Sequence, residues 1–218
     1  MARSALPLAP RVSPPDLPPR LEDGPPLSRD GDYFQLHWSA LDPVTDASHA
    51  TITECRLSGP ALDRLDLAGA SLVDVELFDL RATTVSARGS RWRRVGASGG
   101  RIGTLDLADA DLDEVELRGV RIDYLSLAAG RIADLVVVDC MIGSLDLPRA
   151  SATRIAFSGS RAQEVDTRGM RAKDLDLRRL DALSFLDAGS LRGATLTSRQ
   201  IEELAPALAA AAGIHVLD

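Results

Sequence analysis

The sequence predicts a solenoid, in which the chain coils repeatedly around one long, thin core, and three observations support this prediction. The apolar positions follow a period of five residues from Ala50 onward. Only 4% of the residues are aromatic, so small and aliphatic side chains must fill the interior, as thin repeated layers require. The length of 218 residues is that of one domain and excludes a second large one.

Residues 1–49 are predicted to form a proline-rich N-terminal arm and cap. Nine of the 12 prolines lie within the first 43 residues. This composition predicts an extended segment that packs poorly on the rest of the chain. Aromatic residues interrupt it just before the regular region. We interpret them as a cap on the first coil, with a peptide-like docking element as the alternative; they are Tyr33, Phe34, His37 and Trp38.

The regular region covers residues 50–196. Every fifth residue, here called a centre, is apolar or small, with Thr167 as the one polar exception up to Leu177. The position two residues before each centre is also apolar or small, as at Leu65 and Val75. Neither the 3.6-residue period of a helix nor the two-residue period of a strand keeps such a series on one side. The chain must therefore turn with the repeat.

Units such as Ala110-Asp111-Leu112 and Ala70-Ser71-Leu72 resemble the pentapeptide-repeat family, in which a small and a polar residue precede a central Leu or Phe. The resemblance implies an all-β fold, a right-handed quadrilateral β-helix with four units per turn, and nearly seven turns. A leucine-rich repeat is the rival, because Leu62-x-x-Leu65-x-Leu67 echoes its consensus. That motif recurs every ten residues here, which leaves no room for a return segment.

Residues 197–218 are predicted to form a short C-terminal α-helical cap. The five-residue register slips after Leu180, so we expect a bulge or tight loop within residues 181–189. Thr197 and Gln200 have the spacing of a capping box, and Pro206 is expected to kink or split the helix. Gyrase-inhibiting members of the family pair two subunits through such a region, so the resemblance implies a homodimer as one alternative.

The sequence offers no motif for catalysis, metal binding or a cofactor. Cys55 and Cys140 both occupy inward positions and are expected to be reduced thiols in the core. His37, His49 and His215 all lie outside the repeats, so neither a metal cluster nor a histidine-based triad can be assembled. We therefore expect that the protein is not an enzyme and binds no cofactor.

Charge patterning is the more informative feature of the surface. The position just before the centre is acidic in one set of units and arginine in another, and the two sets are expected on alternate walls. The acidic set is Asp66, Glu76, Asp106, Glu116, Asp146, Asp166 and Asp176; the basic set is Arg81, Arg91, Arg101, Arg121, Arg131, Arg161 and Arg171. Such stripes weaken an interpretation as a DNA mimic, which needs a continuous acidic wall.

One basic segment is a candidate binding site: Arg91, Trp92, Arg93 and Arg94. Trp92 is a centre among the small centres Ala82, Ala87 and Ala97, so it is expected to point inward and fill the space they leave. The alternative is an exposed Trp in a basic patch that binds an acidic partner.

From these features we expect a non-enzymatic scaffold that mediates protein–protein interaction, with an unidentified protein partner. The alternative is a DNA mimic that binds and modulates a type II topoisomerase, DNA gyrase. The net charge of −7 argues against direct nucleic-acid binding. The sequence has neither a membrane span nor a signal peptide, so a cytoplasmic location is expected.

Overall fold

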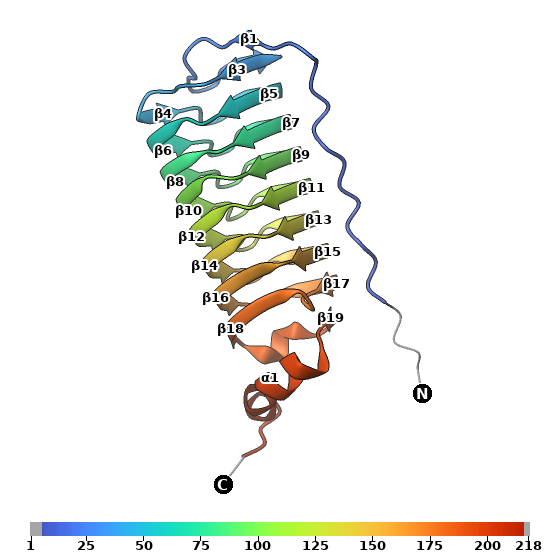
Figure 1. Ribbon diagram of the computed structural model, residues 1–218. Coiled ribbons are helices and arrows are strands. Elements are labelled where there is room, and N and C mark those ends of the chain that lie inside the picture. Colours follow the sequence, from blue (N-terminus) through green and yellow to red (C-terminus); the bar gives the residue numbers. More distant parts are fainter. Residues whose placement is uncertain (1–5, 216–218) are drawn as a thin grey trace.

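The computed structural model describes residues 6–215 and shows one coil of parallel strands stacked into a rod (Figure 1). Residues paired between adjacent turns are twenty apart, as in Ile102 and Ile122, so each turn consists of four five-residue units. The strands form an 11-stranded and an 8-stranded sheet. The smaller sheet receives one strand per turn, so the coil makes about eight turns instead of the expected seven.

The strands of the larger sheet are mostly eight residues long. They are β1 Glu22–Asp23, β2 Asp32–Phe34, β3 Leu36–Trp38, β5 Thr51–Ser58, β7 Ser71–Phe78, β9 Arg91–Ser98, β11 Asp111–Arg118, β13 Arg131–Val138, β15 Ser151–Ser158, β17 Arg171–Asp176 and β19 Ala194–Thr195. The strands of the smaller sheet are β4 Val44–Asp46, β6 Ala61–Asp66, β8 Arg81–Ser86, β10 Arg101–Asp106, β12 Arg121–Ser126, β14 Met141–Asp146, β16 Ser160–Asp166 and β18 Leu180–Leu186.

Each turn has four walls, which we number by their centres. The first wall carries Ile52 and every twentieth residue after it, and the second, third and fourth walls start likewise from Leu57, Leu62 and Leu67. The long strands cross from the first wall to the second at a residue with a left-handed φ, such as 54° at Asp74, where the strand ladder skips one residue. The backbone turns at this position, so its side chain stands on the corner.

The inward register predicted from the sequence is confirmed. From Ile52 to Leu177 every centre is buried except Ala172, which is half-buried. The polar centre, Thr167, is buried because its hydroxyl can donate to the carbonyl oxygens of Leu186 and Asp187, at 2.8 and 3.0 Å. The buried side chains form one continuous core along the rod.

The coil begins one turn before the strict five-residue repeat. Tyr33 pairs with Ile52 and Trp38 with Leu57, so both aromatic residues are centres of an earlier turn, offset by 19 residues instead of 20. Both are buried, and their rings meet edge to face with centroids 5.5 Å apart. Because the offset is one residue short, a search for a period of five starts at Ala50 and misses this turn.

The chain crosses the N-terminal end of the rod before this first turn. The Trp38 indole donates to the carbonyl of Pro25 at 2.7 Å, and the Ser28 backbone N–H donates to the Tyr33 hydroxyl at 2.7 Å. Leu27 is buried beneath this segment. The end of the core is therefore covered by residues 24–28, held by the two aromatic side chains.

The proline-rich arm is extended and none of residues 6–20 is buried, as expected, but the arm is not free of the coil. Residues 6–20 run along the side of the rod, from the N-terminal end nearly to the last turn (Figure 1). Four backbone N–H groups of the arm donate to carboxylates of the coil, from Leu8 at one end to Asp16 at the other. The arm is held because carboxylates of the coil accept the donors that its backbone offers.

Two short elements close the C-terminal end. The 3-10 helix η1, Ala188–Leu191, follows β18, which stays in register with β16 as far as Leu186. The predicted slip therefore occupies residues 187–193, later than expected. Helix α1, Ser198–Ala211, begins with the predicted capping box, in which the Gln200 backbone N–H donates to Thr197 Oγ1 at 3.2 Å and the Thr197 N–H donates to Gln200 Oε1 at 2.8 Å.

The predicted break at Pro206 is absent, because α1 continues through it. Pro206 forfeits one backbone hydrogen bond, to the carbonyl of Glu202, and both residues are exposed, so water can satisfy that oxygen. Gln200 Nε2 donates to the carbonyls of Leu177 and Leu180, at 2.8 and 3.0 Å, and so joins α1 to the last regular turn. Leu204 is the one residue of α1 that is buried among those described.

Candidate functional site

The predicted basic segment does not form one binding surface. Trp92 is fully buried, at 0% exposure, as the inward expectation requires, so its indole cannot contact a partner. Arg94 stands on the corner between the first and second walls and binds Asp74 through two hydrogen bonds of 2.6 and 2.5 Å. Arg91 and Arg93 are exposed on the first wall, and they alone of the four are free to meet a partner.

Many of the aspartates just before centres close turns of the coil. Each accepts the backbone N–H of the residue two positions later, at 2.9 to 3.1 Å; the five are Asp46, Asp66, Asp106, Asp166 and Asp176. An Asp side chain that bonds its own backbone in this way mimics a backbone turn. These carboxylates are therefore structural, which reduces the acidic surface that is free to bind.

Other charged side chains pair between adjacent turns. Arg56 pairs with Glu76 at 2.7 Å and Arg131 with Asp111 at 2.6 Å, each pair joining residues twenty positions apart. Arg161 likewise faces Asp181 at 3.5 Å. Exposed pairs of this kind add little stability each, but each places opposite charges side by side in adjacent turns. The predicted stripes are therefore only partly present. The first wall alternates in sign where Arg131 meets Asp111, whereas Arg81, Arg101 and Arg121 stack as a row of one sign on the third wall.

The corner between the first and second walls carries a continuous column of charge, which we call the charged corner. Its members lie twenty residues apart and all have φ between 51° and 58°: Glu54, Asp74, Arg94, Glu114, Asp134, Arg154 and Asp174. Arg94 and Arg154 donate to Asp74 and Asp134, respectively, in the turn before each arginine. Gln35 Nε2 donates to Glu54 Oε2 at 2.6 Å.

The arm occupies this charged corner through its backbone. The N–H of Leu8 donates to Asp174 at 3.0 Å, that of Arg11 to Asp134 at 2.8 Å, that of Ser13 to Glu114 at 3.1 Å, and that of Asp16 to Asp74 at 2.9 Å. Every carboxylate of the column thus accepts a hydrogen bond from the arm or from Gln35. The two arginine turns are passed over, because arginine has no oxygen to accept one.

Asp74 and Asp134 are the two carboxylates of the charged corner that bind both an arginine and the arm. The Arg94 guanidinium lowers the pKa of the Asp74 carboxyl, and Arg154 does the same to the pKa of Asp134. The arm N–H acts in the same direction at each site, while burial opposes both. Each carboxylate is 4 to 5% exposed and bonded from two sides, so the charged form is strongly favoured.

A shallow groove runs along the third wall, which the arm leaves open. Two depressions of about 940 and 530 Å³ meet at Asp123, and together they extend from Pro43 to Leu183. Glycine lines the groove in two turns, because the backbone of the preceding turn comes too close there for a side chain. A Cβ at Gly103 would lie 2.6 Å from the Thr83 carbonyl oxygen, and one at Gly143 would lie 2.2 Å from that of Asp123.

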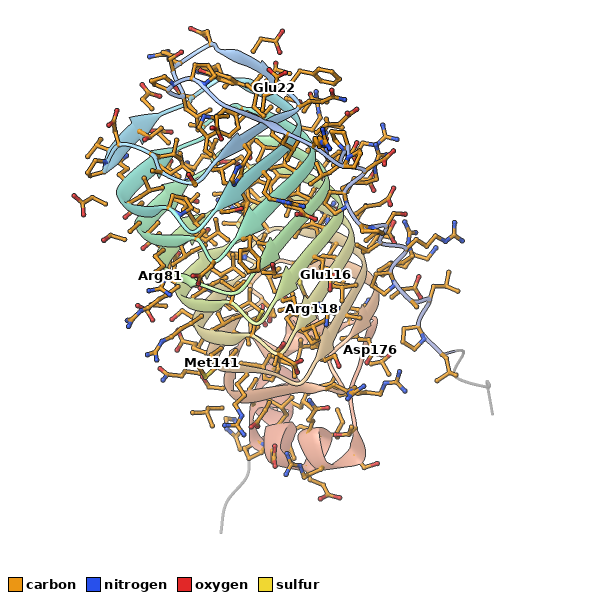
Figure 2. The ribbon with its side chains drawn as sticks, turned by 45° about the horizontal axis from the view of Figure 1, so that its top comes forward. Glu22, Arg81, Glu116, Arg118, Met141 and Asp176 are labelled. Atoms are coloured by element: carbon orange, nitrogen blue, oxygen red, sulfur yellow. The ribbon has the colours of Figure 1, made fainter. Side chains whose placement is uncertain are left out.

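The rim of this third-wall groove combines arginines with exposed apolar side chains. Arg81, Arg101 and Arg121 stack in consecutive turns, and Arg161 continues the row after Met141. The arginine side chains are 53 to 75% exposed, although Asp79, Asp123 and Asp181 each pair with at least one of them. Met141 is 54% and Leu183 80% exposed. Figure 2 shows Arg81 and Met141 at the left of the view, apart from Glu116, Arg118 and Asp176.

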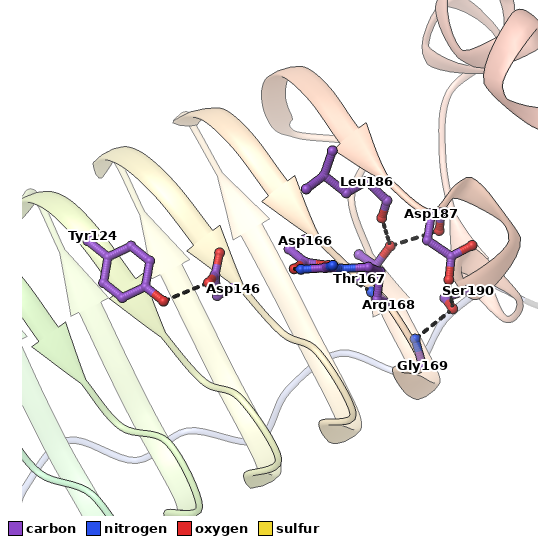
Figure 3. Close-up of polar contacts among 9 residues, drawn as sticks. All are labelled: Tyr124, Asp146, Asp166, Thr167, Arg168, Gly169, Leu186, Asp187 and Ser190. Carbon is purple, nitrogen blue, oxygen red and sulfur yellow. Dashed lines mark hydrogen bonds and ion pairs between the residues drawn. The ribbon is translucent and has the colours of Figure 1, made fainter.

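A polar cluster lies on the fourth wall and continues into the C-terminal end (Figure 3). Tyr124 donates to Asp146 at 2.6 Å, and Arg168 pairs with the buried Asp166. Ser190 Oγ donates to Asp187 at 2.6 Å and accepts the N–H of Gly169 at 3.0 Å. Each group has a partner, so this cluster fixes the last turns and presents no open site.

The histidine, cysteine and acidic side chains form no metal cluster among residues 6–215. No group of three His, Cys, Asp or Glu side chains in this range is placed to hold a metal ion. Cys55 and Cys140 are buried free thiols, and burial raises the pKa of both. Within the same residues, no helix has the length and apolar character needed to span a membrane.

Sequence reasoning missed the charged corner, although a signal was present. Sampling every twentieth residue from Glu54 gives only charged side chains, and the other columns of the regular region are mixed. A comparison of outward positions every five residues mixes the four walls, whereas a spacing of twenty residues keeps the positions of each wall together. The arm itself left no side-chain signal, because its four bonds to the corner come from the backbone.

No family model and no curated protein matches the sequence. Among solved structures, two trypsin-treated variants of QnrB1, a plasmid-mediated fluoroquinolone resistance protein, are similar to it. One has 16% sequence identity and a TM-score of 0.40, covering 88% of this chain and 98% of its own. The other has 15% identity and a TM-score of 0.34, covering 88% and 100%. The fold is therefore assigned from the register and burial of this chain itself.

Proposed function

Because the chain is built as a pentapeptide-repeat β-helix, we propose that it is a non-enzymatic scaffold that binds a protein partner along its third wall. The observation that carries the proposal is the third-wall groove, which spans the length of the smaller sheet and is uncovered. The opposite side of the rod is already occupied by the arm. A long and shallow surface suits another macromolecule better than a small substrate.

The rim indicates the chemistry of that partner. A row of four exposed arginines favours acidic side chains spaced along an extended segment or a helix face. Met141 and Leu183 add exposed apolar surface at one end of the row, where a partner's apolar side chain would be removed from water. Asp79, Asp123 and Asp181 hold the arginines in place until a partner competes for them.

Site-specific crosslinking in the native host tests this proposal. A photoreactive phenylalanine replaces Met141 on the third wall or, as the matched control, Phe78 on the second wall; the two side chains are 54 and 55% exposed. We expect one discrete protein adduct from position 141 and none from position 78. The adduct should disappear with Arg101→Glu and persist with Arg131→Glu, a change on the first wall. Equal adducts from both positions, or none from position 141, would contradict a partner on the third wall.

A further inference from the structure

The hydrogen-bond donors of the arm are spaced to match the turns of the coil. Between Leu8 and Asp16 the arm advances eight residues while the charged corner advances five turns, from Asp174 to Asp74. At about 4.8 Å per turn this is about 24 Å, or about 3.0 Å per residue, close to the 3.1 Å rise of a polyproline II helix. One three-residue turn of that helix therefore spans two turns of the rod.

The steps between donors follow the same match. The donors at residues 8, 11, 13 and 16 are separated by three, two and three residues, while their acceptors are separated by two, one and two turns. The single-turn step is the poorer fit, about 6.2 Å of arm against about 4.8 Å of coil. Its acceptor is Glu114, which has one methylene more than the aspartates used at the other three positions and so reaches further.

The prolines of the arm fall between the donors. Proline has no backbone N–H, and it favours the polyproline II conformation. Pro7 and Pro10 directly precede the donors Leu8 and Arg11, and Pro14 and Pro15 fill the gap between Ser13 and Asp16. Pro15 also lies over Gly96 of the second wall, where a Cβ would be 3.7 Å from its ring. The corner therefore selects a backbone geometry and a pattern of N–H groups.

The side chains of residues 6–20 make no hydrogen bond or ion pair with the coil, although Val12 and Leu17 are half-buried and the positive charge of Arg11 faces Asp134. Leu6 and Leu8 are 76 and 57% exposed, and Asp16 places an acidic side chain beside the acidic Asp74. No backbone-to-backbone hydrogen bond joins residues 6–20 to the coil, so the arm is not a strand of either sheet. The arm can leave the corner without disturbing a strand ladder, because it precedes the first turn of the coil.

We propose that the charged corner is a binding site for proline-rich segments of other proteins in the polyproline II conformation, and that the arm is its resident ligand in cis. A segment qualifies when it offers N–H groups at the three-two-three spacing, with prolines placed between them. The arm competes with such a segment at the effective concentration of a tethered ligand, on the order of millimolar. This second protein-binding surface does not depend on the third-wall groove.

Fluorescence anisotropy with a defined peptide tests the proposal. The probe is a labelled synthetic peptide of residues 6–20, and the receptors are the full chain and a variant that lacks residues 1–20. A second open receptor keeps the whole chain but carries Arg11→Pro and Asp16→Pro, which remove two donors of the arm without changing the coil. We expect saturable binding to both open receptors and at least tenfold weaker binding to the full chain, where the arm competes.

N-methylated peptides supply the matched control. Methylation of the backbone nitrogens of Arg11 and Asp16 removes two donors and should weaken binding at least tenfold, whereas methylation at Val12 and Leu17 should change it less than threefold. A peptide with the same prolines and donor positions but other side chains should bind within about tenfold of the original. Equal binding of the two methylated peptides, or no saturable binding to either open receptor, would overturn the proposal. Neither result bears on the third-wall crosslinks.

Discussion

At the scale of single residues, the inward register predicts which side chains stabilise the rod. Leu112 and Ile122 are centres with 1% exposure, while Asp113 is half-buried on the outside of the first wall. Replacing either centre with alanine should cost about 2 to 5 kcal/mol of unfolding free energy, because it leaves a cavity in a close-packed layer. Asp113→Ala should change it by less than about 0.5 kcal/mol. Urea denaturation measures all three, and similar losses would show that the register is misplaced.

Trp92 permits a second test of the same register. Its fully buried ring fills a layer whose other centres are alanines, so Trp92→Ala should cost about 3 to 5 kcal/mol. In a Trp38→Phe background, iodide should quench the remaining Trp92 fluorescence poorly. The control is Arg91→Ala with Arg93→Ala, which should leave stability nearly unchanged. Ready quenching of the folded protein would mean that the ring faces solvent.

The carboxylates of the charged corner predict how the arm responds to pH. The pKa values of Asp74 and Asp134 are lowered in the folded state by Arg94 and Arg154, respectively. Arg93, Arg11 and Asp16 face the same two sites. A lowered folded-state pKa gives a contribution that is complete above the unfolded value of about 3.9 and is lost as pH falls through the folded value.

The arm N–H groups of Asp16 and Arg11 also lower the pKa of Asp74 and Asp134, so protonation of these carboxyls weakens arm docking. Arm binding should therefore be constant from neutral pH to about pH 4 and weaken below it. The anisotropy of a dye on Leu6→Cys reports this, since Cys55 and Cys140 are buried and escape labelling. The control dye on Leu183→Cys should respond only to global unfolding. A loss of anisotropy at Leu6 between pH 5 and 7 would contradict an arm held by these carboxylates.

At the scale of elements, the docked arm should add to the stability of the coil. It donates four backbone hydrogen bonds to carboxylates, and hydrogen bonds to charged groups contribute more than neutral ones, although ordering the arm opposes them. Removing residues 1–20 should lower unfolding free energy by about 1 to 3 kcal/mol. Thermal unfolding followed by circular dichroism checks this, with Leu6→Ala as the neutral control. An unchanged melting temperature would show that the arm does not pack.

The elements differ in how far the sequence could predict them. The coil could be predicted because each centre must be apolar in every turn, which leaves a period that survives a polar exception such as Thr167. The capping box of α1 could also be predicted, because Thr197 and Gln200 act through side chains whose spacing is visible in the sequence. The docking of the arm could not be predicted, because a proline-rich composition is the same whether the arm is free or bound. The first turn was missed because its offset of nineteen breaks the period.

At the scale of the whole molecule, the distribution of charge predicts whether the rod inhibits DNA gyrase. Ion pairs engage 13 of the 22 acidic side chains in residues 50–196, which also contain 20 basic side chains. Such a surface lacks the continuous negative wall of a DNA mimic. We therefore expect no inhibition of DNA gyrase in a supercoiling assay at micromolar protein. Strong inhibition would favour the DNA-mimic alternative over the scaffold.

The rod as a whole presents two long surfaces that differ in what covers them. The charged corner is covered by the chain's own arm, and the third-wall groove is open on the other side (Figures 1 and 2). Both follow from one property of the coil, which repeats each outward position in every turn. Charged residues at equivalent positions of successive turns thus form a column of carboxylates and two arginines on one corner, and a row of arginines interrupted by Met141 on the third wall.

The claim that the arm is read through its backbone at defined turns is tested most directly by hydrogen exchange of individual arm amides, followed by NMR. Leu8, Arg11, Ser13 and Asp16 should be protected, while Ala9, Val12 and Leu17 exchange rapidly. Asp134→Ala should abolish the protection of Arg11 before that of Asp16, whose acceptor it leaves in place. Equally rapid exchange at all seven amides would contradict the account, because it would show that the arm does not dock on the charged corner.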